Sequence, residues 1–315
     1  MKAAVVRAFD QAPRYETFER PSEGEGVVVD VLAAALSPRV RSSASGRHYT
    51  SDGVLPLVPG LDGVGRTRDG RRVYFLAASD RLGTMAEQTR ADPRLQVALP
   101  DDVSATAIAA AMLPAISSWV ALTKRAALQP GQSVLVLGAT GTAGRLAVQI
   151  AKHLGASRVL AAGRNAQALQ RLRALGADAI VQLTGTVADG DAVAIASEVD
   201  VVLDYLWGGV TGAVMPGLCR RRRDESRALD WVMIGSMAGD EVALSSVLLR
   251  KRNLRVMGSG QGAVSTRDMF SVSPDVVAAF AAGKLQVAVR EAPLADVERQ
   301  WTAPVPSGER LVFVP

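Results

Sequence analysis

Apolar residues in the middle of the chain recur with two alternating periods. Ser133–Leu137 is a short, nearly uninterrupted apolar run of the kind that forms a buried strand. The segment after it repeats its apolar positions at i, i+3, i+4 and i+7, the period of an amphipathic helix, and Gly155 is a typical helix end. These helical positions are Ala147, Ile150, Ala151 and Leu154. We therefore expect a strand, a glycine-rich turn and a helix in succession.

The alternation of strand and helix continues downstream. A second apolar run, Arg158–Ala162, is followed by a helical period that ends at Gly176 and by a third run, Ala179–Leu183. A second half of the same kind follows, and its elements are the strands Val199–Leu203, Trp231–Ile234 and Leu254–Met257 with a weakly helical stretch, Val210–Leu218. Two such halves predict an α/β fold with a doubly wound parallel sheet, the Rossmann architecture.

The segments on either side of this region have a different pattern. Upstream of about residue 115, short strands such as Gly26–Leu32 are interrupted by prolines and glycines, which indicates a β-rich part. Downstream, Ser273 and Pro274 are a helix cap and first turn, and Gly283 ends that helix. The last residues, Glu309–Pro315, have the pattern of a final strand.

Length and composition agree with a folded, two-domain protein. A chain of 315 residues exceeds the usual size of one compact core, and 48% hydrophobic with 21% charged residues is an ordinary globular balance. The first residues form a short apolar burst that ends at Asp10, so we interpret them as a strand and not as a signal peptide. With Cys219 as its single cysteine, the chain forms no internal disulfide. We expect a cytoplasmic protein with no membrane span.

The net charge of +5 raises the question of nucleic acid as a partner. Most arginines are scattered, and the one dense run is Arg220–Arg223, between a helical stretch and an apolar strand. We interpret this run as a solvated loop, because charge runs are usually solvated faces. Binding of an anionic partner is the alternative. We expect that nucleic acid is not a partner of this protein.

A glycine-rich turn connects the first strand of the central region to its helix. In that position glycines allow a tight turn, a close approach of the backbone to a pyrophosphate and close helix packing, and the helix N-terminus offers unpaired N–H groups. A plain connecting turn is the structural alternative. We assign dinucleotide contacts to Gly138, Thr140, Gly141, Thr142, Ala143 and Gly144.

The segment Gly163-Arg164-Asn165 follows the second strand of this region. An NAD-specific fold usually has an acidic residue there to hold the ribose hydroxyls. Arg164 is suited instead to the 2′-phosphate, because a guanidinium pairs with phosphate through two hydrogen bonds. We therefore predict NADPH as the cofactor, held in part by Gly163, Arg164 and Asn165. A surface arginine without a ligand is the alternative interpretation of Arg164.

Several segments together resemble the medium-chain dehydrogenases/reductases, in particular their zinc-independent quinone oxidoreductase branch. The segments are SPRVRSSASGRHY near the start, PGLDGVG at 59–65, LPDDVS at 99–104, GATGTAGRLAVQIAKHLGA at 138–156, LGAD at 175–178 and MIGSMAG at 233–239. The resemblance implies a β-rich GroES-like catalytic domain at 1–115, completed by 265–315, and a Rossmann domain that binds NADPH at 116–264. It also implies an active site in the cleft and, in most relatives, a homodimer formed through the edge of the cofactor domain.

Zinc-dependent relatives carry a cysteine and a Gly-His-Glu where this chain has Ser37 and Gly60-Leu61-Asp62. Catalytic zinc needs three or four protein and water ligands, and the strong soft ligands of this chain are limited to His48, His153 and Cys219. We predict a site without a metal.

A site without a metal must supply hydrogen-bond donors for the oxygen that becomes negative when hydride attacks a quinone or an enone. The resemblance assigns this part of the cleft to Ser37 and to a tyrosine position that either His48 or Tyr49 matches. Histidine titrates near neutrality, and tyrosine offers a hydroxyl and a face for stacking. Further cofactor contacts are assigned to Ser117, Gly235, Ser236, Ser259 and Gly260.

These residues together predict a reductase that transfers hydride from NADPH to a small quinone or α,β-unsaturated carbonyl acceptor, with the cofactor supplying most of the chemistry. Two alternatives stay open: a non-catalytic NADPH-binding protein that regulates a partner or associates with nucleic acid, and a metal-free alcohol dehydrogenase.

Overall fold

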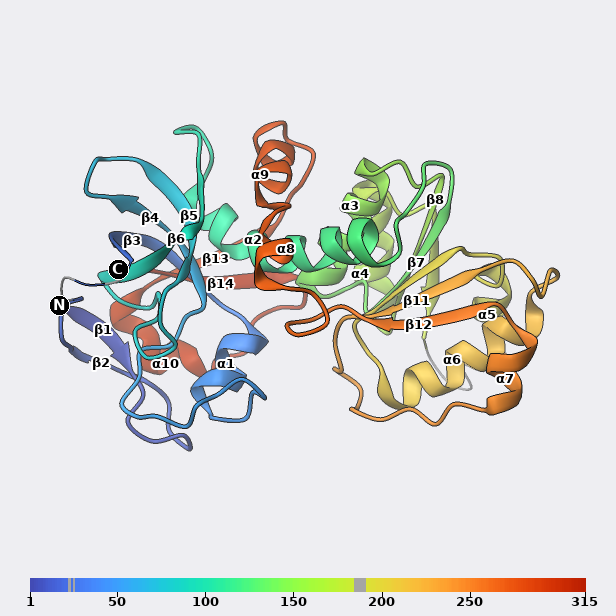
Figure 1. The fold of residues 1–315 in the computed structure, drawn as a ribbon, viewed down its shortest axis with the longest axis horizontal. Coiled ribbons are helices and arrows are strands. Elements are labelled where there is room, and N and C mark those ends of the chain that lie inside the picture. The colour runs from blue at the N-terminus through green and yellow to red at the C-terminus, as the bar shows by residue number, and fades with distance from the viewer. Residues whose placement is uncertain (22–23, 25, 184–190) are drawn as a thin grey trace. The chain divides into compact units, whose positions relative to one another are not determined.

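The computed structural model describes residues 1–21, 24, 26–183 and 191–315 (Figure 1). They divide into two compact units, Met1–Leu113 with Ser273–Pro315, and Pro114–Val272. The boundaries that we expected from the family resemblance are 115/116 and 264/265. The first boundary falls inside the long helix α2 (Ala105–Val120), which is continued by a π-helical turn, η1 (Ala121–Arg125).

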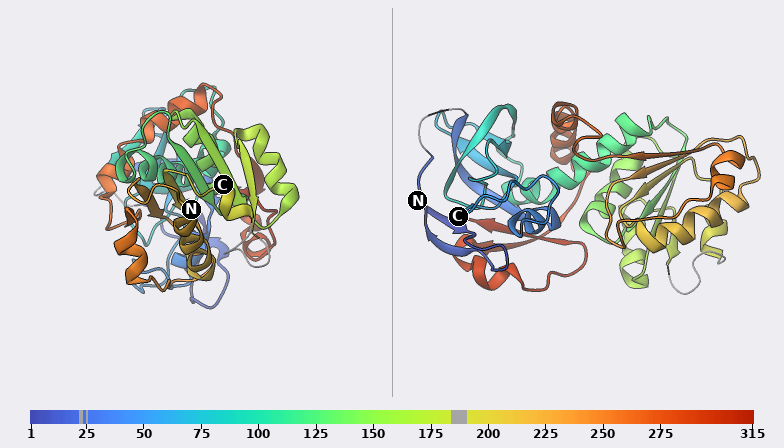
Figure 2. Two further views of the ribbon diagram at one scale, coloured as in Figure 1. Left: turned by 90° about the vertical axis from the view of Figure 1, so that its right-hand side faces the viewer. Right: turned by 60° about the horizontal axis from the view of Figure 1, so that its bottom comes forward.

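The second unit is built on a parallel sheet with the strand order β12-β11-β10-β7-β8-β9. Its strands are β7 (Ser133–Leu137), β8 (Arg158–Gly163), β9 (Ala179–Gln182), β10 (Val201–Asp204), β11 (Leu229–Met233) and β12 (Leu254–Gly258). Its helices are α3 (Thr142–His153), α4 (Ala166–Arg171), η2 (Leu172–Leu175), α5 (Asp191–Ile195), α6 (Gly208–Arg221), α7 (Ser246–Lys251) and α8 (Thr266–Phe270). Helices lie on both faces of the sheet in Figure 2. The predicted doubly wound α/β fold is confirmed.

The direction in which strands are added to this sheet reverses between β7 and β10. From β7 the chain moves to β8 and β9, whereas β10 pairs with the other edge of β7 and continues to β11 and β12. Right-handed crossovers then put α3 and α4 on one face and α6 on the other. The loops after β7 and β10 therefore diverge at the carboxyl edge of the sheet, which is where doubly wound folds bind ligands.

The first unit is β-rich, as predicted. Its larger sheet has the order β13-β14-β3-β4-β5-β6, and β3 also pairs with β6, while β1 and β2 form a separate antiparallel pair. The strands are β1 (Lys2–Val5), β2 (Arg14–Thr17), β3 (Val27–Leu36), β4 (Asp62–Thr67), β5 (Arg72–Ala77), β6 (Gln88–Ala98), β13 (Ala288–Pro293) and β14 (Glu309–Val314). The helices are α1 (Pro38–Ala44), α9 (Ser273–Ala281), η3 (Leu294–Asp296) and α10 (Val297–Trp301). Segments from both ends of the chain thus share one core, which includes Val5, Val29, Phe75 and Phe313.

One helical segment among the described residues, Ala105–Arg125, is long and apolar enough to cross a membrane. Its most apolar window is 67% buried inside the protein, as expected for a core helix. The apolar character of this segment is therefore used in packing.

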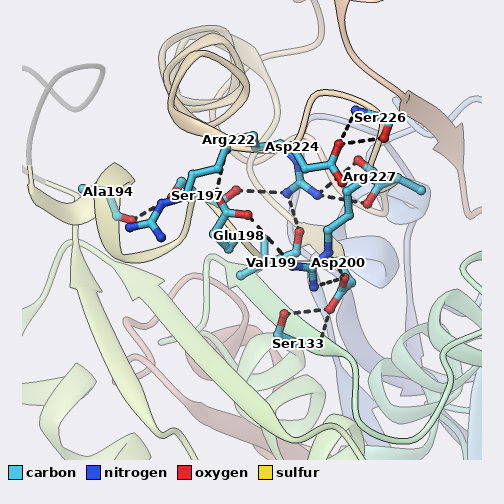
Figure 3. Close-up of polar contacts among 12 residues, drawn as sticks. Ser133, Ala194, Ser197, Glu198, Val199, Asp200, Arg222, Asp224, Ser226 and Arg227 are labelled. Carbon is cyan, nitrogen blue, oxygen red and sulfur yellow. Dashed lines mark hydrogen bonds and ion pairs between the residues drawn. The ribbon is translucent and has the colours of Figure 1, made fainter.

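The arginine run corrects one expectation. Arg220 and Arg221 belong to α6, and Arg222, the residue that follows this helix, is only 4% exposed. Its guanidinium donates to the carbonyl oxygens of Ser197 at 2.9 Å, Val199 at 2.6 Å, Arg227 at 3.3 Å and Ala228 at 3.1 Å. Figure 3 shows this cluster beside the Asp200–Arg227 ion pair. The interpretation of the run as a loop is wrong for Arg220 and Arg221, which are helical, and the expected solvation is wrong for Arg222, although Arg220 and Arg223 are exposed. Local charge density does not reveal that a folded chain encloses one of these side chains.

Candidate functional site

The glycine turn lies at the carboxyl end of β7. Gly138 has φ +85°, a conformation that favours glycine, and its amide donates to the Ala162 carbonyl at 3.0 Å. The chain then reaches Gly141, which caps α3 with φ −74° and ψ 166° and offers no side chain to the amides of the first helical turn. Amides in the first turn of a helix have no carbonyl partner within that helix and can donate to an anion.

The glycines of the turn meet different surroundings. A Cβ on Gly144 would lie 2.4 Å from the Gly138 carbonyl oxygen and 2.5 Å from the Ala139 Cα, so α3 packs directly on the turn. A Cβ on Gly141 would be 3.7 Å from its nearest neighbour, the same carbonyl oxygen. Gly144 is therefore required by the fold, whereas the space beside Gly141 fits the approach of a pyrophosphate group. The turn and the helix N-terminus together fit a bound dinucleotide.

The second predicted cofactor segment adjoins the turn. A Cβ on Gly163 would lie 3.0 Å from Cγ2 of Thr140, so the two segments are in contact. The Asn165 side chain accepts a hydrogen bond from the Ala168 amide at 3.0 Å and caps α4. Arg164 is exposed, and among the described residues its guanidinium has no ion-pair partner. Arg164 thus directly follows a residue that contacts the glycine turn, and its side chain is exposed.

Tyr205, which the sequence reasoning missed, joins three of the predicted segments. A Cβ added to Gly138 would lie 3.3 Å from the Tyr205 Cβ. A Cβ added to Gly235 would lie 3.2 Å from the Tyr205 carbonyl oxygen. Its hydroxyl lies 2.7 Å from the Ser118 hydroxyl, and burial raises the pKa of Tyr205 to about 12 against the opposing hydrogen bonds to Ser118 and Ser117. The sequence could have indicated Tyr205, because it directly follows a predicted buried strand and therefore lies at the edge of the sheet where ligands bind.

The loop that carries Tyr205 is held by a buried carboxylate. Asp204 is 0% exposed and accepts hydrogen bonds from the amides of Leu206 and Trp207, both at 2.9 Å, from the Thr211 hydroxyl at 2.5 Å and from the Trp231 indole at 2.9 Å. Trp207 has φ +55°, a strained conformation for a non-glycine residue. The four hydrogen bonds that Asp204 accepts hold this loop beside the glycine turn.

The remaining predicted cofactor residues lie at the same edge. The Ser117 hydroxyl donates to the Pro114 carbonyl at 2.8 Å, and Ser236 is exposed after β11. Ser259 is 5% exposed, and its amide donates to the Met233 carbonyl at 2.8 Å. Its buried hydroxyl has no hydrogen-bond partner among the described residues. Gly260 follows it and accepts a bond from the Val264 amide at 3.0 Å.

The predicted catalytic residues belong to the first unit. Ser37 caps α1, and its hydroxyl accepts a hydrogen bond from the Val40 amide at 3.1 Å. His48 and Tyr49 follow α1 with their ring centroids 4.3 Å apart, and Tyr49 is 72% exposed. The His48 ring nitrogens lie 2.7 Å from Nη1 of Arg39 and 2.9 Å from the Thr50 hydroxyl.

A small cavity of about 40 Å³ lies beside this group. None of the three predicted catalytic residues lines it, but two residues bonded to His48 do. Its lining is Arg39, Val40, Ser43, Ala44, Thr50, Ser51, Asp52, Leu57, Pro59, Gly60, Leu61 and Asp80. The sequence reasoning missed Arg39, whose position directly after Ser37-Pro38 was the available signal.

Asp62, in the segment where zinc-dependent relatives carry ligands, has a different use in this fold. It is 4% exposed and accepts a hydrogen bond from the Tyr74 hydroxyl at 3.1 Å. Burial raises the pKa of the Asp62 carboxyl to about 6, while Tyr74 and the nearby Arg310 oppose the shift. Across the described residues, no three His, Cys, Asp or Glu side chains form a group that would hold a metal ion.

No family model matches the chain, but individual relatives do. It is 30% identical over 366 aligned positions to the probable NADPH-dependent quinone reductase tdiC of Emericella nidulans, and the alignment covers 100% of both proteins. It is 33% identical over 175 residues to the 2-methylene-furan-3-one reductase of Solanum lycopersicum, which covers 50% of this chain and 45% of that protein.

Solved structures show the same fold over the full chain. The quinone oxidoreductase of Thermus thermophilus, also solved in complex with NADPH, matches with a TM-score of 0.82 and 25% identity over 100% of both chains. A probable oxidoreductase from Mycobacterium abscessus matches with a TM-score of 0.80 and 25% identity, covering 100% of this chain and 99% of the other.

Proposed function

Because the chain belongs to the quinone oxidoreductase branch of the medium-chain dehydrogenase/reductase superfamily, we propose that it is an NADPH-dependent reductase of quinones or α,β-unsaturated carbonyl compounds. The observation that carries this proposal is the turn at Gly138–Gly144. It combines a backbone that leaves room for a pyrophosphate with the N-terminus of α3 and an exposed cation, Arg164, beside it. For a quinone the balanced reaction is NADPH + H⁺ + quinone → NADP⁺ + hydroquinone.

In this proposal the second unit binds and orients the cofactor. The amides of the first turn of α3 hold the pyrophosphate, and Arg164 holds the 2′-phosphate. The loop fixed by Asp204 and the hydroxyls of Ser117 and Ser259 form the rest of the binding edge. When bound, NADPH supplies the hydride, and the first unit supplies the acceptor site near Ser37, His48 and Tyr49.

We further propose that the reaction uses no zinc. Two residues at the positions where zinc-dependent relatives carry zinc ligands make other contacts in this fold: Ser37 caps a helix, and Asp62 accepts a hydrogen bond from Tyr74. We also propose a cytoplasmic homodimer formed at the edge strand β12. Val256 on that strand and Val247 and Leu249 on α7 are exposed by 36–47%, as expected for a surface that a second copy covers.

Steady-state NADPH oxidation with 1,4-benzoquinone, menadione and 3-penten-2-one tests the function. We expect turnover with at least one acceptor, a much weaker reaction with NADH, and no loss of activity after treatment with a zinc chelator. Tight NADPH binding without turnover would refute the reductase assignment, and a salt-sensitive complex with RNA or DNA would then favour the regulatory alternative. Reduction of NADP⁺ by simple alcohols as the sole activity would instead identify an alcohol dehydrogenase.

A further inference from the structure

The guanidinium of Arg39 is the centre of the polar group at the cavity. Nη1 lies 2.7 Å from Nε2 of His48, and Nη2 donates to the Thr50 hydroxyl at 3.1 Å. Tyr49 forms a further side-chain hydrogen bond with Arg39. Three consecutive residues, 48 to 50, are therefore held by one cation from α1.

The contact between Arg39 and His48 determines where the imidazole proton lies. Arginine has N–H donors and no acceptor, so Nε2 of His48 must accept the hydrogen bond at 2.7 Å. Two groups of Thr50 face the other ring nitrogen, Nδ1: the hydroxyl at 2.9 Å and the backbone amide, a competing donor, at 3.2 Å. Because the charged donor Arg39 at 2.7 Å is the stronger of the two donors, a neutral imidazole accepts at Nε2 and carries its proton on Nδ1, toward the Thr50 hydroxyl. In this state His48 has no N–H group left for a ligand.

Protonation of His48 is also opposed by its surroundings. An imidazolium would place two cations 2.7 Å apart. Burial and the charge of Arg39 lower the pKa of His48, and Asp80, which faces it from the loop after β5, only partly opposes this shift. The rings of His48 and Tyr49 are in contact at 4.3 Å, and Thr50 completes the set of polar neighbours. His48 is thus a neutral hydrogen-bond acceptor near pH 7.

Arg39, in contrast, lines the cavity and retains donors for a ligand. A guanidinium has more N–H groups than its three partners use. The Arg39 Nε is buried without a hydrogen-bond partner among the described residues, so water does not fully solvate this cation. A cavity of about 40 Å³ exceeds the space of a single water and has room for a carbonyl oxygen.

We propose that Arg39 is a catalytic residue that binds the acceptor's carbonyl oxygen, and that His48 is a positioning residue that holds Arg39 and donates no proton. This inference rests on the proposed function. In an enone, a C–H bond forms at the β-carbon, the π electron pair moves to the carbonyl oxygen, and a solvent proton neutralises the enolate while NADPH becomes NADP⁺. A partly desolvated guanidinium at that oxygen stabilises the charge as it develops.

Kinetics of four variants with 3-penten-2-one and 1,4-benzoquinone test the proposal. We expect R39M to lower kcat by about 100-fold or more, the usual cost of losing one oxyanion donor, with the Kd for NADPH unchanged. R41M is the matched control, because Arg41 is on the same helix but lies over the Trp301 ring at 5.5 Å, and its kinetics should equal those of the wild type. H48Q retains an acceptor for Arg39 and should stay within about threefold of the wild type, whereas H48F, which removes the acceptor, should lose about tenfold or more.

Nitrogen NMR of the wild-type imidazoles provides a readout that does not depend on how variants fold. The chain has two histidines, so H153Q assigns the His48 signals directly. We expect the neutral Nδ1–H tautomer of His48 at pH 7 to 8, and titration at higher pH in R39M than in the wild type. An Nε2–H tautomer, normal kcat in a folded R39M, or a loss in H48Q as large as in R39M would overturn the proposal. An inactive wild type would instead refute the proposed function, which separates the two failures.

Discussion

Two glycines of the same turn allow folding and cofactor binding to be separated by experiment. In G144A the new Cβ would meet backbone atoms at 2.4, 2.5 and 2.9 Å, and none of them belongs to a flexible side chain. Helix α3 must therefore move away from the turn by roughly 1 Å to restore ordinary contact. Overpacking of this kind costs about 3 kcal/mol when backbone must give way, and we expect the Tm of the second unit to fall by about 10 °C.

G141A is the matched variant. The φ of −74° and ψ of 166° at Gly141 suit alanine, and its Cβ would have 3.7 Å of clearance, so we expect stability within about 1 kcal/mol of the wild type. The same Cβ would project into the space that we propose for the pyrophosphate, so we expect the Kd for NADPH to rise about tenfold or more. Calorimetric unfolding and titration with NADPH measure the two effects. A G141A variant that binds NADPH as well as the wild type, or a G144A variant with unchanged Tm, would show that the turn does not act as described.

Three further predictions concern charged side chains. Arg164→Ala should weaken NADPH binding by about 10- to 100-fold and leave NADH binding unchanged in fluorescence titrations, because only NADPH carries the 2′-phosphate; equal losses would place Arg164 elsewhere. The raised pKa of Asp62, about 6, means that its contribution to stability is complete below the unfolded value of 3.8 and is lost as pH rises through 6. A pKa shift of about two units corresponds to about 3 kcal/mol. Chemical denaturation of the wild type should therefore show the free energy of unfolding falling between pH 4 and 7, and D62N should lack this fall. The same pH dependence of stability in both proteins would contradict the assignment. Arg222→Met should lower the free energy of unfolding by about 3 kcal/mol or more, because it leaves four carbonyl oxygens without their donor. In the same denaturation assay, the control Arg223→Met at an exposed position should change it by less than about 0.5 kcal/mol. Similar effects of both substitutions would mean that the network contributes little.

Local patterns along the chain were sufficient to predict the architecture of the second unit. The apolar run Ser133–Leu137 forms β7 with those same limits, and the helical period after it forms α3. Periodicity succeeds here because a parallel sheet covered by helices buries whole strands and one face of each helix. The glycine spacing likewise identified the turn, since its conformations depend on the absence of a side chain at particular positions.

Contacts between distant segments decided the rest. Arg222 lies in a run of charges, yet the fold surrounds it with carbonyl oxygens from the loop before β10 and the loop before β11, which no local pattern encodes. Tyr205 lies beside the predicted cofactor turn because the sheet brings the end of β10 next to β7. The ambiguity between His48 and Tyr49 was of the same kind: their motif is local, but the proton position in His48 depends on Arg39, nine residues away on α1. A hydrogen bond has direction and a partner, and only tertiary structure specifies both.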